Sequence, residues 1–155
     1  LVVMLMGQPG DPDPGWQQDS LDKFAARHGG LAPIVLVADQ TRDHATDPMC
    51  VDSAKYGNAS TYITQDVLPW ARSHLRVLQD PAHTVIAGYS NGGECAISFG
   101  ARYPDLWTNV LDISGELYPG SDHPAQAVKD VFGGSQAAYQ ATWPQNILAA
   151  GHYHD

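Results

Sequence analysis

The stretch HTVIAGYSNGGECAISFG, residues 83–100, constrains the fold of this chain more than any other feature. An apolar run over 83–87 predicts a strand, and small and apolar residues at helical spacing over 91–103 predict a helix. Between them stands GYSNG, residues 88–92, which has the pattern Gly-x-Ser-x-Gly. The turn must be very tight, because a Cβ two residues before or after the serine would meet neighbouring main chain.

Such a turn holds its serine in a strained conformation and projects the hydroxyl above the sheet. Ser90 is therefore a candidate nucleophile. The N–H of Asn91, at the start of the predicted helix, is a candidate donor to an oxyanion. The alternative is a glycine-rich turn that binds a phosphate or only packs tightly. No lysine follows Gly92 or Gly93, as the usual phosphate-binding loop would require.

The rest of the chain alternates apolar runs with helical patterns. Strands are predicted over 1–6, 32–38, 83–87 and 108–113, and helices over 17–28, 59–78, 91–103, 125–132 and 136–150. Pro69 should kink or break the second of these helices. Polar stretches over 7–16 and 39–58 are predicted loops. This order predicts an α/β fold with a parallel sheet and helices on both faces, whose ligands bind at the carboxyl ends of the strands.

Length and charge exclude several classes of protein. The 155 residues are predicted to form a single domain, 1–155. The net charge is −9 and no cluster of Lys or Arg occurs, which argues against binding to nucleic acid or to an anionic membrane face. No apolar run approaches the length of a transmembrane helix. The first residues, LVVMLM, lack the basic flank of a signal peptide and predict a strand, so we expect a segment upstream to have been lost.

The two cysteines, Cys50 and Cys95, fit no zinc-binding spacing, and no metal site is predicted. They are interpreted either as a disulfide formed in an oxidising compartment or as two buried free thiols. Their spacing alone leaves both interpretations open.

Four segments carry a resemblance to a known family: MLMGQPGDPDPGW (4–16), YGNASTYITQDVLPW (56–70), AGYSNGGECAISFGARYPDLW (87–107) and DISGELYP (112–119). With these, the chain resembles the α/β-hydrolase superfamily and, within it, the putative-esterase family. That family includes esterase D (S-formylglutathione hydrolase), enterochelin esterases and the antigen 85 mycolyltransferases. The resemblance implies an α/β-hydrolase fold that here lacks the family's first strands and its C-terminal segment with the catalytic acid and histidine.

The resemblance also implies roles for single residues. Ser90 matches the nucleophile, and the main-chain N–H groups of Gln8 and Asn91 match the two donors of the oxyanion hole. Trp16 and Tyr89 are expected at the substrate pocket, and an ordinary core or rim tryptophan is the alternative for Trp16.

The long loop over 39–58, with its cysteine, resembles that of envelope-facing actinobacterial members of the family. The resemblance implies that Cys50 pairs with Cys95. It further implies a secreted or otherwise extracytoplasmic protein, with a cytoplasmic one as the alternative.

A catalytic triad also needs a base and an acid, which follow the serine in the order acid, then histidine, in this fold. Only 65 residues follow Ser90. The candidate bases are His123, His152 and His154, and the candidate acids are Asp112, Glu116, Asp122 and Asp155. Of these, His154, His152 and Glu116 are retained as the base and acid. The alternative is that the tail is a polar linker and that the rest of the polypeptide, or a second chain, supplies the missing groups.

The sequence thus predicts a serine esterase that forms an acyl-enzyme with a small-molecule, lipid or glycolipid ester and needs no cofactor. Two alternatives remain. One is an acyltransferase of the antigen 85 type, and the other is a non-catalytic module on the same fold, since the acid and histidine are not evident. A phosphate- or nucleotide-binding protein is disfavoured, because residues 7–10, GQPG, offer neither a lysine nor a ribose-binding acid.

Overall fold

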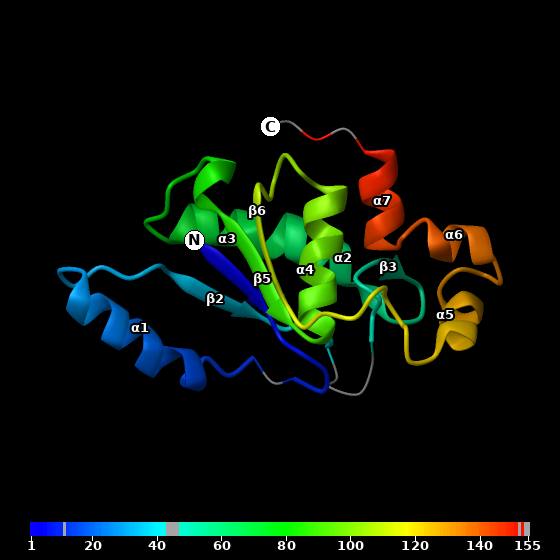
Figure 1. Ribbon diagram of the computed structural model, residues 1–155, viewed down its shortest axis with the longest axis horizontal. Coiled ribbons are helices and arrows are strands. Elements are labelled where there is room, and N and C mark those ends of the chain that lie inside the picture. Colours follow the sequence, from blue (N-terminus) through cyan, green and yellow to red (C-terminus); the bar gives the residue numbers. More distant parts are fainter. Residues whose placement is uncertain (11, 43–46, 152, 154–155) are drawn as a thin grey trace.

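The computed structural model describes residues 1–10, 12–42, 47–151 and 153 (Figure 1). Its centre is a parallel sheet of four strands in the order β2-β1-β5-β6. Leu5 of β1 pairs with Ala38 on one side and with Gly88 on the other, so these strands end at one rim. The predicted α/β class with a parallel sheet is confirmed. The strands are β1 (Val2–Leu5), β2 (Val35–Ala38), β5 (Val85–Tyr89) and β6 (Asn109–Ile113).

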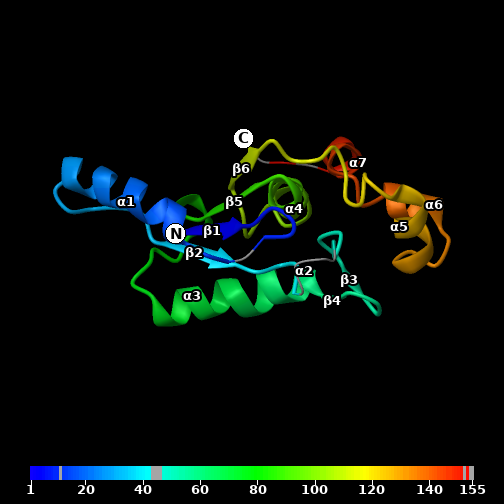
Figure 2. The same cartoon turned by 90° about the horizontal axis from the view of Figure 1, so that it is seen from below.

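Helices cover both faces of this sheet (Figure 2). One face carries a continuous helical segment made of α2 (Ala59–Thr61), a π-helical turn (Tyr62–Val67) and α3 (Leu68–His74). The other face carries α4 (Asn91–Arg102), while α1 (Gly15–Arg27) lies at one end of the molecule. The main core joins apolar side chains of the sheet to those of both helical layers, including Val3, Leu5, Ile63, Leu68, Ile86 and Phe99.

A second, smaller core lies at the end of the molecule opposite α1 (Figure 1). It is built on Met49, Ala127 and Tyr139, which are buried. Around it lie the short hairpin β3–β4 and three short helices, of which α7 also packs on α4. The elements are β3 (Asp52–Ser53), β4 (Gly57–Asn58), α5 (Pro124–Asp130), α6 (Gln136–Gln140) and α7 (Pro144–Ala150).

Prolines and local turns change several predicted boundaries. The helix predicted over 59–78 ends at His74, and Pro69 does not break it. A π-helical turn directly before Pro69 widens the backbone, so that the proline ring and its missing N–H fall where the hydrogen-bond pattern changes. The helix predicted over 136–150 is two helices, because Pro144 occupies the first turn of α7.

The strand expected to start at His83 instead follows a single 3₁₀ turn, Pro81–His83, and begins at Val85. The strand predicted over 32–38 begins only at Val35. The stretch 39–58, predicted as a loop, contains β3 and β4. β6 forms an edge of the sheet, and Val110, Leu111 and Ile113 are 41–51% exposed.

Candidate active site

Ser90 stands in the turn between β5 and α4, at the carboxyl end of the sheet. Its main chain has φ 53° and ψ −126°, a conformation that costs energy for any residue with a Cβ. Hydrogen bonds on both sides hold it there. Its N–H donates to the carbonyl of Ile113 at 3.0 Å, and its carbonyl accepts from the N–H groups of Gly93 and Glu94 at 2.9 and 3.1 Å.

Three glycines make this turn possible. A Cβ on Gly88 would overlap the carbonyl group of Gly92, and a Cβ on Gly92 would overlap the carbonyl group of Leu5 in β1. A Cβ on Gly7 would lie 2.7 Å from the ring of Tyr89 and 3.2 Å from the Cβ of Ser90. The loop after β1 therefore approaches Ser90 directly, main chain against side chain.

The buried side chain of Gln40 connects this loop to the start of α4. Its Oε1 accepts a hydrogen bond from the N–H of Met6 at 3.3 Å, and its Nε2 donates to the carbonyl of Met6. The same Nε2 lies 3.3 Å from Oδ1 of Asn91, to which it also donates. One side chain thus contacts both segments that carry the predicted oxyanion donors, Gln8 and Asn91.

A cavity of about 610 Å³ opens above Ser90. It brings together residues from the β1 loop, the stretch before β3, and the segment after β6. Three carboxylates face it, those of Asp47, Glu116 and Asp122. Its described lining is Gln8, Pro9, Asp47, Met49, Tyr56, Ser90, Glu116, Gly120, Asp122, His123 and Gln126.

The cavity gathers some of the predicted bases and acids. Glu116 accepts a hydrogen bond from the Ser121 hydroxyl at 2.7 Å, while Asp122 and His123 are exposed. Asp112 instead accepts from the N–H of Gly115 at 2.8 Å. Within the described part of the chain, no imidazole is hydrogen-bonded to the Ser90 hydroxyl. The predicted His152, His154 and Asp155 lie outside the described residues, so the assignment of the base and the acid stays a prediction.

The two predicted aromatic pocket residues have different placements. The main chain of Trp16 belongs to the first turn of α1 rather than to the preceding loop, and its side chain is not among those described. Tyr89 ends β5, and its half-buried ring lies beside Gly7. The aromatic ring that the described residues place on the cavity wall is that of Tyr56.

A disulfide attaches one cavity wall to α4. It joins Cys50 to Cys95, whose Cα atoms are 5.3 Å apart. The fully buried Glu94 lies beside it, with its Oε2 3.0 Å from Cys50 Sγ. Burial raises the pKa of Glu94 to about 8, although the Ser98 hydroxyl donates to its Oε1 at 2.6 Å. Because a disulfide sulfur carries no proton, the neutral carboxyl group must supply the hydrogen of this contact.

Cys50, Cys95 and Glu94 also form the one group of potential metal ligands within the described ranges. Both sulfur atoms are bonded to each other, so this group offers no thiolate to a metal. No cofactor site is needed for the chemistry that Ser90 suggests.

An ion pair lies beside the cavity residues Tyr56 and Gln126. Lys55 pairs with Asp130 of α5, and the hydroxyl of Tyr56 donates to the same carboxylate at 3.2 Å. The hydrogen bond from Lys55, followed by that from Gln126, lowers the pKa of Asp130 to about 2. These contacts join the hairpin to α5.

Among the residues of this site that the sequence did not predict are Gln40, Asp47, Tyr56 and Glu94. Gln40 offered a signal, since it is a polar residue two positions beyond a predicted strand, at the rim where ligands bind. Asp47 and Tyr56 lie in the long polar stretch that was predicted as one loop. Glu94 gave no signal, because its position in α4 reads as an ordinary helical glutamate.

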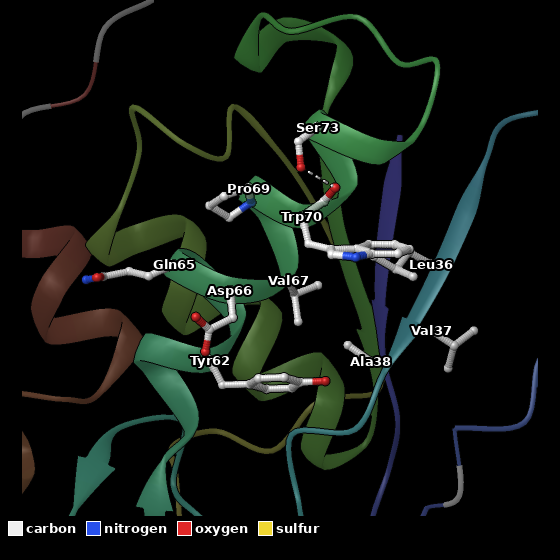
Figure 3. Close-up of a pocket in the computed structure, with 10 residues that line it drawn as sticks. All are labelled: Leu36, Val37, Ala38, Tyr62, Gln65, Asp66, Val67, Pro69, Trp70 and Ser73. Atoms are coloured by element: carbon white, nitrogen blue, oxygen red, sulfur yellow. Dashed lines mark hydrogen bonds between the residues drawn. The ribbon is translucent and has the colours of Figure 1, made fainter.

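A second groove, of about 680 Å³, lies between β2 and the helical segment that contains α3 (Figure 3). Its lining is mainly apolar, with Leu36, Val67 and Trp70 among the side chains drawn. Its serine, Ser73, donates its hydroxyl to the carbonyl of Trp70 at 3.0 Å. Ser73 lies within the helix α3, so it lacks the strained main-chain conformation that distinguishes Ser90.

Comparison with known proteins identifies the family of the chain. The family model described as Putative esterase matches residues 10–152. The chain belongs to this esterase family. An uncharacterized protein of Corynebacterium glutamicum is 34% identical to the chain over 152 residues.

Two solved members of the fold resemble the chain in structure. A ferulic acid esterase has a TM-score of 0.71 and 19% identity over 97% of this chain. The S-formylglutathione hydrolase FrmB of Staphylococcus aureus has a TM-score of 0.64 and 17% identity over 96% of it. At such identities the likeness concerns the fold.

The chain spans only part of each of these relatives. It covers 35% of the Corynebacterium protein, 59% of the ferulic acid esterase and 57% of the S-formylglutathione hydrolase. Separately, none of the described helices has the length and apolar character needed to cross a membrane.

Proposed function

We propose that this member of the esterase family is a serine hydrolase of carboxylic esters and that Ser90 is its nucleophile. The observation that carries the proposal is the strained Ser90, at φ 53°, which faces a cavity at the amino end of α4. A strained serine that only glycine neighbours permit has little structural use, and such strain occurs where it serves chemistry.

The reaction would take place in two steps. The Ser90 oxygen bonds to the ester carbonyl carbon while its proton passes to a base. The carbon–oxygen bond to the alcohol then breaks, and the alcohol leaves with that proton. Water adds to the acyl-enzyme in the same way and releases the carboxylic acid and the free serine. In both steps the main-chain N–H groups of Gln8 and Asn91 would stabilise the oxyanion.

The base is proposed to come from outside the described residues. His152 or His154 is one source, and a further segment of the polypeptide or a second chain is another. The relatives support the second source, because the chain spans 59% of the ferulic acid esterase and 35% of the Corynebacterium protein. Among the described residues, Glu116 stays the proposed acid, and it lines the cavity with Ser90, as Asp47 and Asp122 also do.

The cavity favours an uncharged or positively charged ester. Three carboxylates line it, and its described lining holds neither a lysine nor an arginine. Each carboxylate raises the energy of a bound anion. Small-molecule, lipid and glycolipid esters all remain within this class. If a sugar hydroxyl replaced water in the second step, the same site would transfer the acyl group, as in the antigen 85 alternative.

An extracytoplasmic location is proposed as well. A buried disulfide between the cavity wall and α4 supports it, because such bonds persist in oxidising compartments.

The test is the intact mass of the protein before and after exposure to a fluorophosphonate, which forms a covalent adduct with activated serines. We expect one adduct, and none in the Ser90→Ala variant. The measurement is made on the 155-residue chain and on the longest natural polypeptide that contains it. An adduct on both chains places the base within residues 1–155, whereas an adduct on the longer one alone places it elsewhere. No adduct on either folded chain would refute the proposed function.

Substrate charge is tested with three butyrate esters of similar size: the choline ester, its uncharged 3,3-dimethylbutyl analogue and the glycolate ester. We expect kcat/KM to be at least about tenfold lower for the anionic glycolate ester than for the neutral ester at low salt. Equal values for the neutral and anionic esters would refute the charge preference alone.

A further inference from the structure

We propose that Gln40 is a positioning residue that fixes the two oxyanion donors relative to each other. This inference rests on the proposed function, since it assumes that the N–H groups of Gln8 and Asn91 serve an oxyanion. Gln40 does not line the cavity above Ser90 and is 3% exposed, so it would act through the main chain that it holds.

The first part of the argument is the bond pattern of the Gln40 amide. The regular pairing of β1 with β2 ends at Leu5 and Ala38. Beyond that point, the side chain of Gln40 accepts from the N–H of Met6 and donates to its carbonyl. A side-chain amide thus takes the place of a main-chain peptide group and extends the ladder by one residue. Met6 is held on both of its polar groups at the last position before the loop.

The second part of the argument is how Met6 and Gln40 are connected to the two proposed donors. Gln8 lies two residues beyond Met6, and the intervening Gly7 packs against the Cβ of Ser90. On the other side, Gln40 Nε2 also donates to Oδ1 of Asn91, at 3.3 Å. Asn91 is 1% exposed, and its own N–H is the second proposed donor. The single amide of Gln40 therefore spans both halves of the proposed oxyanion hole.

The consequence lies in the transition state rather than in substrate binding. Oxyanion donors act strongly because they are fixed in place before charge develops. Loss of a direct donor lowers kcat by about 10²–10³. Loss of a residue that only positions the donors should lower it less, by about tenfold, while KM changes little.

The experiment compares Gln40→Leu and Gln40→Glu with the wild type in the longest natural polypeptide. Leucine removes all three hydrogen bonds, and glutamate keeps the shape of the side chain but cannot donate from its second oxygen. The control is Gln79→Leu, because the Gln79 amide also donates two hydrogen bonds, in this case to the main-chain carbonyls of Arg72 and Val77. Gln79 precedes β5, at the opposite end of that strand from Ser90. We measure kcat and KM for a neutral ester and the affinity for a boronic acid that mimics the tetrahedral intermediate.

We expect both Gln40 variants to lose about tenfold in kcat and in boronic-acid affinity, with KM within about twofold of the wild type. A merely structural role would instead lower the melting temperature and the fraction of active enzyme, without changing the affinity of the enzyme that remains folded. Equal boronic-acid affinity in the wild type and both variants would overturn the inference.

A second readout does not depend on activity. Amide hydrogen exchange at Gln8 and Asn91 should become faster in Gln40→Leu and stay unchanged in Gln79→Leu. Unchanged exchange at both donors would overturn the inference even if no ester were hydrolysed. Failure of the proposed function is recognised separately, by the absence of a fluorophosphonate adduct on the wild type.

Discussion

The two walls of the Ser90 cavity are built in opposite ways. One wall is formed by the loop after β1 and by the turn between β5 and α4, where glycines allow close approach of the main chain. The other consists of side chains from 47–58 and 116–130, held by a disulfide, a buried carboxyl group and an ion pair. The comparison shows that the Ser90 turn is fixed by close main-chain packing at glycines, whereas the shape and charge of its cavity depend on side-chain contacts between distant parts of the chain.

This difference predicts how each wall fails. A substitution in the Ser90 wall should lower the stability of the whole sheet, because an added side chain there meets main-chain atoms that cannot shift without moving a strand. A change in the opposite wall should loosen the cavity and leave the sheet in place. Four measurements test this contrast, and they follow from the largest expected effect to the smallest.

The largest effect is expected for Gly88→Ala. The added Cβ would overlap the carbonyl group of Gly92 and approach the N–H of Gly93, and both are main chain. We expect the free energy of unfolding to fall by on the order of 5 kcal/mol. The control is Gly29→Ala, where no atom lies within 4 Å of the added Cβ and only the positive φ of 64° is unfavourable. That variant should lose about 1 kcal/mol. Similar losses in urea unfolding of the two variants would contradict the contrast.

The next effect is expected for the double variant Cys50→Ser/Cys95→Ser. The bond closes a loop with a sequence separation of 45 residues. In the chain-entropy model its loss costs about 4 kcal/mol, mainly through a less restricted unfolded state. A reducing agent should lower the stability of the wild type to that of the double variant and leave the variant unchanged. If the reducing agent has no effect on the wild type, the two cysteines are not bonded in solution.

A smaller effect, which depends on pH, is expected for Glu94→Gln. The pKa of Glu94 is raised from 4.5 to about 8, so the folded state holds a proton that the unfolded state releases between these values. The contribution of this group to stability is therefore fully present below about pH 4.5 and is lost as the pH rises to about 8. Glutamine cannot ionise, and we expect the variant to exceed the wild type by a few kcal/mol at pH 8 but not at pH 4.

The difference in unfolding free energy between wild type and Glu94→Gln, plotted against pH, checks this. The control is Asp22→Asn, which removes an exposed carboxylate of α1 at the far end of the molecule (Figure 1). A flat difference for Glu94→Gln between pH 4.5 and 8 would show that the carboxyl group is not buried beside the disulfide.

The smallest effect is expected for Lys55→Ala, which removes the ion pair with Asp130. The Lys55 side chain is half-exposed, and exposed pairs contribute little and are screened by salt. The melting temperature should fall slightly at low salt and match the wild type at high salt. If the loss of stability were as large as in the disulfide variant, the packing of the hairpin on α5 would depend on this pair. That result would contradict the small contribution expected of an exposed ion pair.

Much of the fold followed from local patterns. Apolar runs located all four strands of the sheet, and Gly29-Gly30 and Gly133-Gly134 marked real breaks between elements. Some helix boundaries were predicted wrongly, because local backbone features are not visible in the hydrophobic periodicity. Pro144 began a new helix inside a helical pattern, while a π-helical turn let the chain continue past Pro69.

The sequence by itself determined the Ser90 turn. A Cβ on Gly88 would meet main chain only a few residues away, at Gly92 and Gly93, so this part of the pattern is readable in one dimension. Gly92 additionally faces the carbonyl group of Leu5, which only the sheet brings close. The tertiary structure alone decided that Gln40 reaches Met6 and Asn91, that Glu94 is buried beside Cys50, and that Asp47 faces the same cavity as Glu116. Each of these contacts joins residues 34–69 positions apart, and their hydrogen bonds and burial exist only after the sheet has brought those segments together.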